Sequence, residues 1–308
     1  MDEHSFDGRV AVITGAGRGI GRAYARLLAE RGARVVVNDL GGSMRGEGAD
    51  AGPAATVTDE IVAAGGDAIA DTSDVATEAG ARTLVDAAIE RFGRLDVLIT
   101  NAGIIRWADF PDVEADDFDR HLAVHLWGSF HTARAAWPHM AAQEYGRVVM
   151  TTSTGMLGLP NNASYAAAKA GVIGLARSLA TAGVPLGIRV NLVAPAAMTR
   201  MAGRSGEDAD VAASSPMAPE LVAPLVGFLA HESCPVTGEI YTAGGGRFAR
   251  MFVAVAEGYV HPGPVTIEDV EQHWAAINDA SSSYIPADLN AWSAAFAAHL
   301  TPDGGPRA

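Results

Sequence analysis

The stretch "RVAVITGAGRGIG", residues 9–21, joins a β-branched run to a glycine-rich turn, and a helical pattern follows over about residues 19–31. Gly15 can make the tight turn, Gly19 permits close approach of a ligand, and Gly21 lets the helix pack on the strand. The helix N-terminus offers amide donors and a positive dipole end to a pyrophosphate. This strand–turn–helix order indicates a dinucleotide site.

The same alternation of strand and helix continues beyond this stretch. Strands are predicted at residues 9–14, 34–38, 95–100, 146–150, 188–193 and 238–243. Near-continuous apolar strands with intervening helical patterns indicate an α/β fold whose parallel sheet is covered on both faces. The Gly/Ala-rich residues 41–55 are predicted to form a surface loop.

The chain is predicted to have one α/β domain, residues 1–247, and a helical C-terminal extension, residues 248–308. In the extension, "TIEDVEQHWAAI" (266–277) starts with Thr266 as a helix N-cap and has Asp269 three positions later. A second amphipathic helix is expected over residues 287–300. We expect the extension to pack on the same domain or on a partner subunit.

Composition limits the classes of partner. The formal net charge is −14 at pH 7, which repels nucleic acid and anionic membranes. A single cysteine, Cys234, excludes an internal disulfide framework and fits a reducing compartment. The polar N-terminus is unlike a signal peptide, and no apolar run reaches the ~18–20 residues of a membrane span. We expect a cytoplasmic protein with a small-molecule substrate.

Asp39 follows the second predicted strand, 18 residues after Gly21. A carboxylate there can accept hydrogen bonds from the adenosine ribose and repel a 2′-phosphate, which favours NAD over NADP. Arg18, in the glycine-rich turn, favours NADP instead, because a basic side chain there can bind a 2′-phosphate. Asp39 is expected to dominate, since it lies at the ribose itself. The alternative is that Asp39 only caps a loop.

"SYAAAK" (164–169) places Tyr165 and Lys169 four residues apart, on one helix face. A tyrosine with a pKa near ~10 is a poor base at neutral pH. An adjacent ammonium group and a cationic nicotinamide favour the phenolate. The pair can then take a proton from an alcohol while hydride leaves for NAD⁺. The alternative is a surface helix with a chance Tyr and Lys.

Four motifs in this order, "TGAGRGIG", "NAG" (101–103), "SYAAAK" and "NLVAPAAMT" (191–199), resemble the short-chain dehydrogenase/reductase family over about residues 6–247. The resemblance implies a Rossmann-type, doubly wound parallel sheet of about seven strands. It also implies Tyr165 as base, Lys169 as its electrostatic partner, and a hydroxyl that binds the substrate oxygen. Thirteen positions before Tyr165, where the family usually has Ser, stands Thr152. Thr152 is preferred for this role, and its neighbour Ser153 is the alternative.

The resemblance also extends the expected NAD site. Asp74 resembles the acid that contacts adenine, Asn101 to Gly103 the turn beside the ribose, and Thr199 the carboxamide contact. Ala196 stands where the family usually has Gly, which puts the local loop geometry in question. The expected cofactor residues are Gly15, Arg18, Gly19, Ile20, Gly21, Asp39, Asp74, Val75, Asn101, Ala102, Gly103, Tyr165, Lys169, Pro195 and Thr199.

A narrower resemblance rests on "VNDLGGSMRGEG" (37–48), "VHLWGSFHTARAAWPHM" (124–140), "HESC" (231–234) and "EGYVHP" (257–262). These stretches are similar to the dehydrogenase portion of peroxisomal multifunctional enzyme type 2, also called 17β-hydroxysteroid dehydrogenase type 4. That likeness implies oxidation of a (3R)-hydroxyacyl-CoA or a 17β-hydroxysteroid with NAD. We expect no hydratase or sterol-carrier domain here, and the final residues, "PRA", are unlike a peroxisomal address.

"HLAVHLWGSFH" (121–131) contains three histidines, two of them four residues apart. His121 and His125 share a helix face but lack the Glu and third ligand of a zinc site, so no metal is expected. By the family resemblance, His125 occupies the position of an Asn that shapes the helix and holds a water of a proton relay. The alternative is a core histidine bonded to a carbonyl.

Three functions remain open. A (3R)-hydroxyacyl-CoA could contact local positive charge, at Arg45, Arg106, Arg200 or Arg204. A hydroxysteroid could lie against apolar residues, namely Trp107, Met156, Leu157 and Met198. The third is a regulator or scaffold that binds NAD without turnover; a 3-oxoacyl reductase is a further variant of the enzyme reading. The family resemblance implies a homodimer or homotetramer through the long helices over about residues 115–138 and 163–182.

Overall fold

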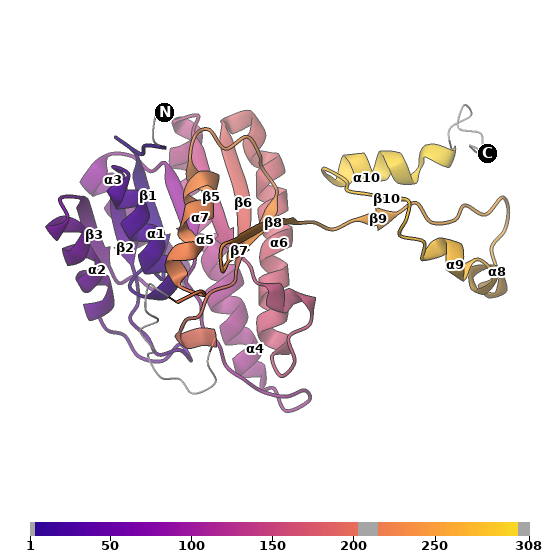
Figure 1. The fold of residues 1–308 in the computed structure, drawn as a ribbon, viewed down its shortest axis with the longest axis horizontal. Helices are drawn as coiled ribbons and strands as arrows, with labels where there is room; N and C mark the ends of the chain where they lie inside the picture. The colour runs from indigo at the N-terminus through magenta and orange to yellow at the C-terminus, as the bar shows by residue number, and fades with distance from the viewer. Residues whose placement is uncertain (1–3, 203–214, 301–308) are drawn as a thin grey trace. The chain divides into compact units, whose positions relative to one another are not determined.

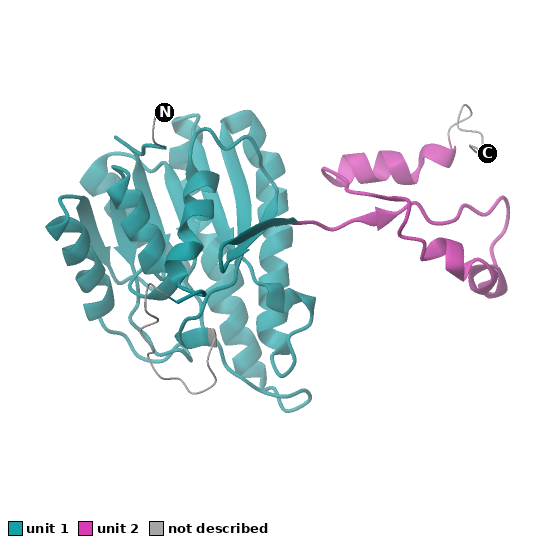
Figure 2. Ribbon diagram, viewed as in Figure 1, with its two compact units in different colours: residues 1–250 teal, residues 251–308 magenta. Residues whose placement is uncertain are grey.

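The computed structural model describes residues 4–202 and 215–300. The chain folds into two compact units, Met1–Arg250 and Met251–Ala308 (Figure 2). The predicted boundary lay at residues 247/248. None of the described helices is long and apolar enough to cross a membrane.

The first unit is built on an eight-stranded sheet with the order β3-β2-β1-β4-β5-β6-β7-β8 (Figure 1). The first seven strands in this order pair in parallel. The order reverses between β1 and β4, which is the switch point where such sheets bind ligands. The strands are β1 Val10–Thr14, β2 Arg34–Asn38, β3 Asp67–Asp71, β4 Val97–Thr100, β5 Gly146–Thr151, β6 Ile188–Pro195, β7 Ile240–Gly244 and β8 Arg247–Met251.

Helices cover both faces of the sheet, as the alternating pattern predicted. One buried cluster joins alternate residues of the central strands to α1, α2 and α7. The helices α3, α5 and α6 cover the other face (Figure 1). The helices of this unit are α1 Gly19–Glu30, α2 Gly52–Ala63, α3 Glu78–Phe92, α4 Ala115–His121, α5 Gly128–Ala142, α6 Ala163–Gly183 and α7 Ala223–Ala230.

Two strands of the first unit and the start of one of its helices were not predicted from the sequence. Strand β3, "DAIAD", has acidic residues at both ends and lacks the β-branched run that marks the central strands. Strand β8 follows β7 after only Gly245 and Gly246, and such a short connection permits only an antiparallel hairpin. The predicted loop 41–55 ends early, because Pro53 lies in the first turn of α2 and fits a helix start.

The predicted helix over 115–138 is not uniform. A π-helical turn, Leu122–Trp127, separates α4 from α5 and contains His125. The Ser129 hydroxyl donates to the carbonyl of His125 at 2.7 Å, so this carbonyl keeps a partner where the helical ladder changes. Single π turns inside α-helices are frequent at functional sites.

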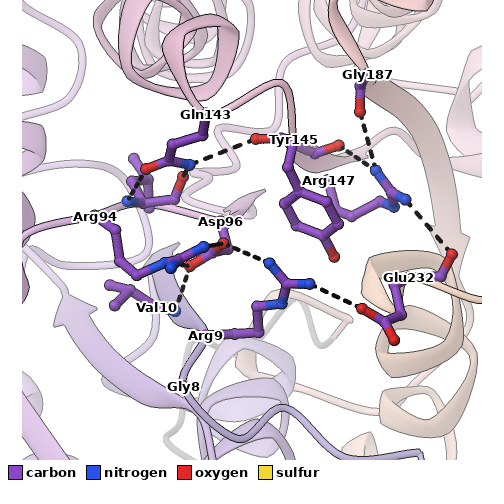
Figure 3. Close-up of polar contacts among 12 residues, drawn as sticks. Gly8, Arg9, Val10, Arg94, Asp96, Gln143, Tyr145, Arg147, Gly187 and Glu232 are labelled. Atoms are coloured by element: carbon purple, nitrogen blue, oxygen red, sulfur yellow. Dashed lines mark hydrogen bonds and ion pairs between the residues drawn. The ribbon is translucent and has the colours of Figure 1, made fainter.

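A polar cluster lies at the amino edge of the sheet, where β1, β4 and β5 begin (Figure 3). The fully buried carboxylate of Asp96 accepts hydrogen bonds from Arg9 at 3.0 Å and from Arg94 at 2.6 Å. The guanidinium groups of Arg9 and Arg147 lie over the ring of Tyr145, at 3.9 and 4.4 Å from its centroid. The cluster therefore links three neighbouring strands and neutralises the buried carboxylate.

The second unit contains short elements only. Its strands β9, Val255–Ala256, and β10, Ser283–Tyr284, pair antiparallel. Thr266 and Asp269 form the capping box of α8, as the sequence suggested, although Asp replaces the usual Glu. None of residues 251–300 is buried. The helices of this unit are α8 Ile267–Gln272, α9 Trp274–Ile277 and α10 Leu289–Phe296.

Candidate active site

A cleft of about 770 Å³ lies where β1, β2 and β4 end. That volume is in the range of small-molecule and cofactor sites. The predicted cofactor residues that line it are Gly15, Arg18, Gly19, Ile20, Asp39, Asp74, Val75, Asn101, Ala102, Gly103 and Thr199. Gly21, Tyr165, Lys169 and Pro195 are not among its lining residues.

The glycine-rich turn is shaped for close approach. Gly15 has φ +64°, and a Cβ there would meet the Cα of Ala102 at 2.7 Å. A Cβ on Gly21 would collide with the carbonyl of Gly15, so this glycine lets α1 pack on the turn. Gly19 has φ +51°, a conformation that favours glycine, and a Cβ there would make only an ordinary contact, at 3.5 Å to Thr199. The turn thus leaves room beside the start of α1, which fits a dinucleotide pyrophosphate.

Thr14 is a residue of this site that the sequence analysis missed. Its hydroxyl accepts hydrogen bonds from the amides of Asn101 and Ala102, at 2.9 and 3.0 Å. The Asn101 side chain donates in return to the carbonyls of Thr14 and Gly15, at 3.2 and 3.1 Å. The two loops of the switch point are therefore fixed to each other. The sequence signal that could have identified Thr14 is a side-chain hydroxyl at the end of an apolar strand.

Asp39 directly follows β2 and lines the cleft. Its carboxylate accepts hydrogen bonds from the amides of Gly17 at 2.9 Å and Gly41 at 2.7 Å. These bonds fix its orientation, and each carboxylate oxygen retains a lone pair for a ligand hydroxyl. Arg18 also lines the cleft, and its Nη1 is buried without a hydrogen-bond partner among residues 4–202 and 215–300.

The start of α6 positions the tyrosine. The Asn162 side chain caps this helix and accepts a hydrogen bond from the Tyr165 amide at 3.1 Å. The side chain of Ser153 lies near that of Tyr165, since a Cβ on Gly155 would meet the Ser153 hydroxyl and the Tyr165 ring, each at 3.3 Å. Lys169 lies one turn later, and its Nζ is 5.8 Å from the centre of the Tyr165 ring. This Nζ donates to the carbonyl of Thr151 at 2.8 Å.

Thr152 and Ser153 have different partners. The Thr152 hydroxyl donates to the carbonyl of Lys169 at 2.8 Å, and the residue is only 1% exposed. It fastens the end of β5 to α6. Ser153 is less buried and is the hydroxyl that acts on the pKa of Tyr165. The Thr152 hydroxyl is thus engaged with α6, whereas Ser153 lies toward Tyr165, and which of the two contacts a substrate oxygen stays a prediction.

Burial controls the charge of the catalytic pair. It raises the pKa of Tyr165 from its ordinary value, and the hydrogen bond from Ser153 partly offsets that rise. Burial lowers the pKa of Lys169 to about 7. The lowering of the Tyr165 pKa expected from Lys169 together with a cationic nicotinamide stays a prediction.

His125 is buried beside this pair. Its ring meets that of Tyr165 edge to face, at 5.2 Å between centroids. Its Nε2 is 2.9 Å from the carbonyl of Ile104, and its Nδ1 is buried without a hydrogen-bond partner in the described part of the chain. Burial, and then the charge of Lys169, lower the pKa of His125 well below its ordinary value, so the ring is neutral. With the proton on Nε2, Nδ1 is a buried acceptor.

His121 has a structural environment. Its Nδ1 is 2.7 Å from the carbonyl of Asp117, and its Nε2 accepts from the Arg106 amide at 3.2 Å. Its ring stacks on that of His125 at 6.0 Å. Within residues 4–202 and 215–300, no group of three or more His, Cys, Asp or Glu side chains could hold a metal.

The loop after β6 accommodates its departure from the family pattern. Pro195 ends β6, and Thr199 reaches the cleft. The Ala196 amide donates to the carbonyl of Ala243 at 2.8 Å, which continues the pairing of β6 with β7. Opposite it stands Gly244, where any Cβ would collide with the Ala196 carbonyl. Gly244 therefore lets β7 pass close to the backbone of the loop after β6.

The arginines proposed for a CoA phosphate differ in availability. Arg106 is paired with Asp116 and Asp117, at 3.1 and 2.9 Å, and its side chain is only 11% exposed. Arg45 is 54% exposed and 3.8 Å from Glu47. Arg106 therefore stabilises α4 through these ion pairs, and Arg45 remains a candidate for contact with a CoA phosphate.

Arg200 lines the cleft and donates to the carbonyl of Gly42 at 3.3 Å. Arg204 lies outside the described residues. Of the proposed apolar contacts, Leu157 is 75% exposed and Met198 is 47% exposed, whereas Trp107 and Met156 are half-buried.

Comparison with known proteins agrees with this geometry. The family described as short chain dehydrogenase matches residues 9–210. A Mycobacterium tuberculosis protein described as a short-chain type dehydrogenase/reductase is 42% identical over 278 residues, 90% of this chain and 96% of that protein.

Peroxisomal multifunctional enzyme type 2 of Drosophila melanogaster is 42% identical over 283 residues, 90% of this chain and 46% of that protein. The chain thus spans less than half the length of this relative. The full-length Drosophila structure aligns with a TM-score of 0.76 at 34% identity, over 94% of this chain and 48% of that one. A 7α-hydroxysteroid dehydrogenase, solved with NADH and 7-oxo glycochenodeoxycholic acid, aligns with a TM-score of 0.69 at 32% identity, over 80% of this chain and 96% of that one.

Proposed function

This chain belongs to the short-chain dehydrogenase family, whose members are NAD(P)-dependent oxidoreductases, and from that premise we propose that it oxidises a secondary alcohol to a ketone with NAD. The observation that carries the proposal is the contact between the Ser153 and Tyr165 side chains, with Lys169 one turn away on α6. Tyr165 supplies a proton acceptor, Ser153 a hydroxyl that can bind the substrate oxygen, and Lys169 a cation. The three residues lie beside a cleft suited to a dinucleotide.

The residues divide the work of proton transfer. Ser153 holds the substrate hydroxyl, Tyr165 takes its proton as the phenolate, and the ketone forms as hydride leaves the carbinol carbon. Burial alone disfavours this phenolate, so the positive charges of Lys169 and of a bound nicotinamide are needed to form it. Bound NAD⁺ supplies the hydride acceptor and a positive charge near the phenol. Lys169 is held in place by the carbonyl of Thr151 and passes the proton outward. His125 offers its open Nδ1 as an acceptor on that path.

NAD, rather than NADP, is proposed because of Asp39. Its carboxylate is fixed by two amides at the end of β2, where it can bind two ribose hydroxyls. A 2′-phosphate at this position would face that negative charge.

A (3R)-hydroxyacyl-CoA is the proposed substrate. The likeness to multifunctional enzymes, including a Saccharomyces cerevisiae protein named peroxisomal hydratase-dehydrogenase-epimerase at 41% identity, supports a fatty-acyl oxidation step. The exposed Arg45 is available to a CoA phosphate. A 17β-hydroxysteroid is the second candidate, supported by the structural likeness to a hydroxysteroid dehydrogenase and by the exposed apolar side chains Leu157 and Met198.

A panel of alcohols tests this function. NADH formation is followed by absorbance at mildly alkaline pH with a (3R)-hydroxyacyl-CoA, its (3S) isomer and estradiol. NADH consumption is followed in the reverse direction with a 3-oxoacyl-CoA. We expect turnover of the (3R)-hydroxyacyl-CoA, lost in Tyr165→Phe. Equal slow rates in wild type and Tyr165→Phe with every substrate would instead support a non-catalytic NAD-binding regulator or scaffold.

Assembly and compartment complete the proposal. We propose a homodimer or homotetramer in the cytoplasm, with residues 248–308 as an extension of the dehydrogenase domain that packs on it or on a partner subunit. The extension has no buried residue among 251–300, which supports a role in packing against other surface. Light scattering measures the assembly state directly.

A further inference from the structure

An ion pair lies in the cofactor cleft beside Asp39. Arg22, on α1, donates from Nε and Nη2 to the two carboxylate oxygens of Glu60, on α2, at 3.0 and 2.9 Å. Both side chains are 33% exposed, and both residues line the same cleft as Asp39 and Arg18. The bidentate geometry makes this a strong and well-oriented contact for a half-buried pair.

Arg22 is placed to serve a phosphate. Arg18 is the N-cap residue of α1 and Arg22 lies in the first turn of this helix, and both residues line the cleft. A guanidinium fork on this face is the group that would neutralise a 2′-phosphate on the adenosine ribose. The two arginines at the start of α1, Arg18 and Arg22, therefore favour NADP, in conflict with Asp39.

Glu60 resolves this conflict. It accepts hydrogen bonds from the two guanidinium nitrogens that a phosphate would use, and it adds its own negative charge to the lining of the cleft. We propose that Glu60 is a specificity-determining residue of the cofactor site, which favours NAD over NADP by holding Arg22 in this ion pair. The inference rests on the proposed NAD-dependent function and deepens it.

Glu60→Gln tests the inference, because Gln keeps the shape of the side chain and removes its charge. Dissociation constants of NADH and NADPH are measured by fluorescence titration at low salt, where such contacts are screened least. We expect the affinity for NADPH to rise about fivefold in Glu60→Gln, the size of one partly screened ion contact, while that for NADH stays nearly constant. In Arg22→Ala/Glu60→Gln the gain disappears, because the cation is gone.

Glu78→Gln is the matched control, since Glu78 pairs with Arg134 at 3.1 Å on the surface and does not line the cleft. An unchanged NADH/NADPH ratio in Glu60→Gln, or a gain that persists in the double variant, would overturn the role of Glu60. Asp39→Ala removes the carboxylate proposed to bind the ribose, so it tests the proposed NAD preference independently of the role of Glu60. If the wild type binds neither nucleotide, the proposed function itself fails, and the inference fails with it.

Discussion

Ser153 and Thr152 are sequence neighbours at the end of β5, yet their hydroxyls contact different parts of the molecule. We predict that Ser153→Ala lowers kcat about 100-fold, because the variant loses a polar contact to the reacting oxygen. Thr152→Ala is expected to cost about 1 kcal/mol of unfolding free energy, through the lost bond to the Lys169 carbonyl, and to change kcat far less. Steady-state kinetics and urea unfolding measure both effects. A larger loss of kcat in Thr152→Ala would restore the assignment made from spacing.

The chemistry of the site could be predicted from residues more fully than its geometry. Motif and position predicted roles for Tyr165, Lys169 and Asp39. In the structure, Tyr165 and Lys169 lie one turn apart on α6, and Asp39 follows β2. Which of two adjacent hydroxyls faces Tyr165 depends on the backbone beyond β5, and residue spacing does not determine that. The same holds for Arg22 and Glu60, which are far apart in sequence and meet only through helix packing.

Lys169 makes the stability of the protein depend on pH. Its pKa in the folded protein is about 7, below the ordinary lysine value of 10.5. Between these values the unfolded chain binds more protons than the folded one, so the free energy of unfolding rises with pH. We predict that Lys169→Met flattens this rise, which amounts to at most about 1.4 kcal/mol per pH unit. Urea unfolding of both proteins from pH 7 to 10 measures the difference. Parallel curves would contradict the buried, depressed lysine.

At the scale of elements, the turn between β1 and α1 leaves no room for a Cβ at Gly15. We predict that Gly15→Ala abolishes NADH binding, because its Cβ would meet Ala102 at 2.7 Å and φ is +64°. Gly65→Ala is the matched control: its φ is +91°, but nothing lies within 4 Å of the added Cβ. It should cost about 1–2 kcal/mol in stability and leave the affinity for NADH unchanged. Equal loss of binding in both variants would show that backbone strain alone is responsible.

The elements could be predicted where hydrophobic pattern and turn chemistry agreed. The central strands were found because they are buried on both faces and read as apolar runs. β3 and β8 lie toward the ends of the sheet, where burial is partial and the apolar signal is weak. The π turn could not be foreseen either, because it arises from side-chain contacts around His125 and not from helix propensity.

At the scale of the whole molecule, the two units differ in how they are stabilised. The first holds the buried core and every lining residue of the cleft, and residues 251–300 include no buried side chain. We predict that a chain ending at Met251 folds and binds NADH with an unchanged dissociation constant. Thermal unfolding and fluorescence titration measure this. Aggregation or loss of NADH binding in the shortened chain would contradict independent folding of the first unit.

The cluster around Asp96 and Tyr145 has a consequence for how this protein can change over time. It anchors the strands at their amino ends, whereas the loops that meet cofactor and substrate follow their carboxyl ends. Insertions, deletions and new side chains can therefore accumulate in those loops while the opposite rim maintains the register of the sheet. Directed evolution for new alcohol substrates can therefore vary the loops at the carboxyl ends of the strands and leave the residues at the amino ends unchanged.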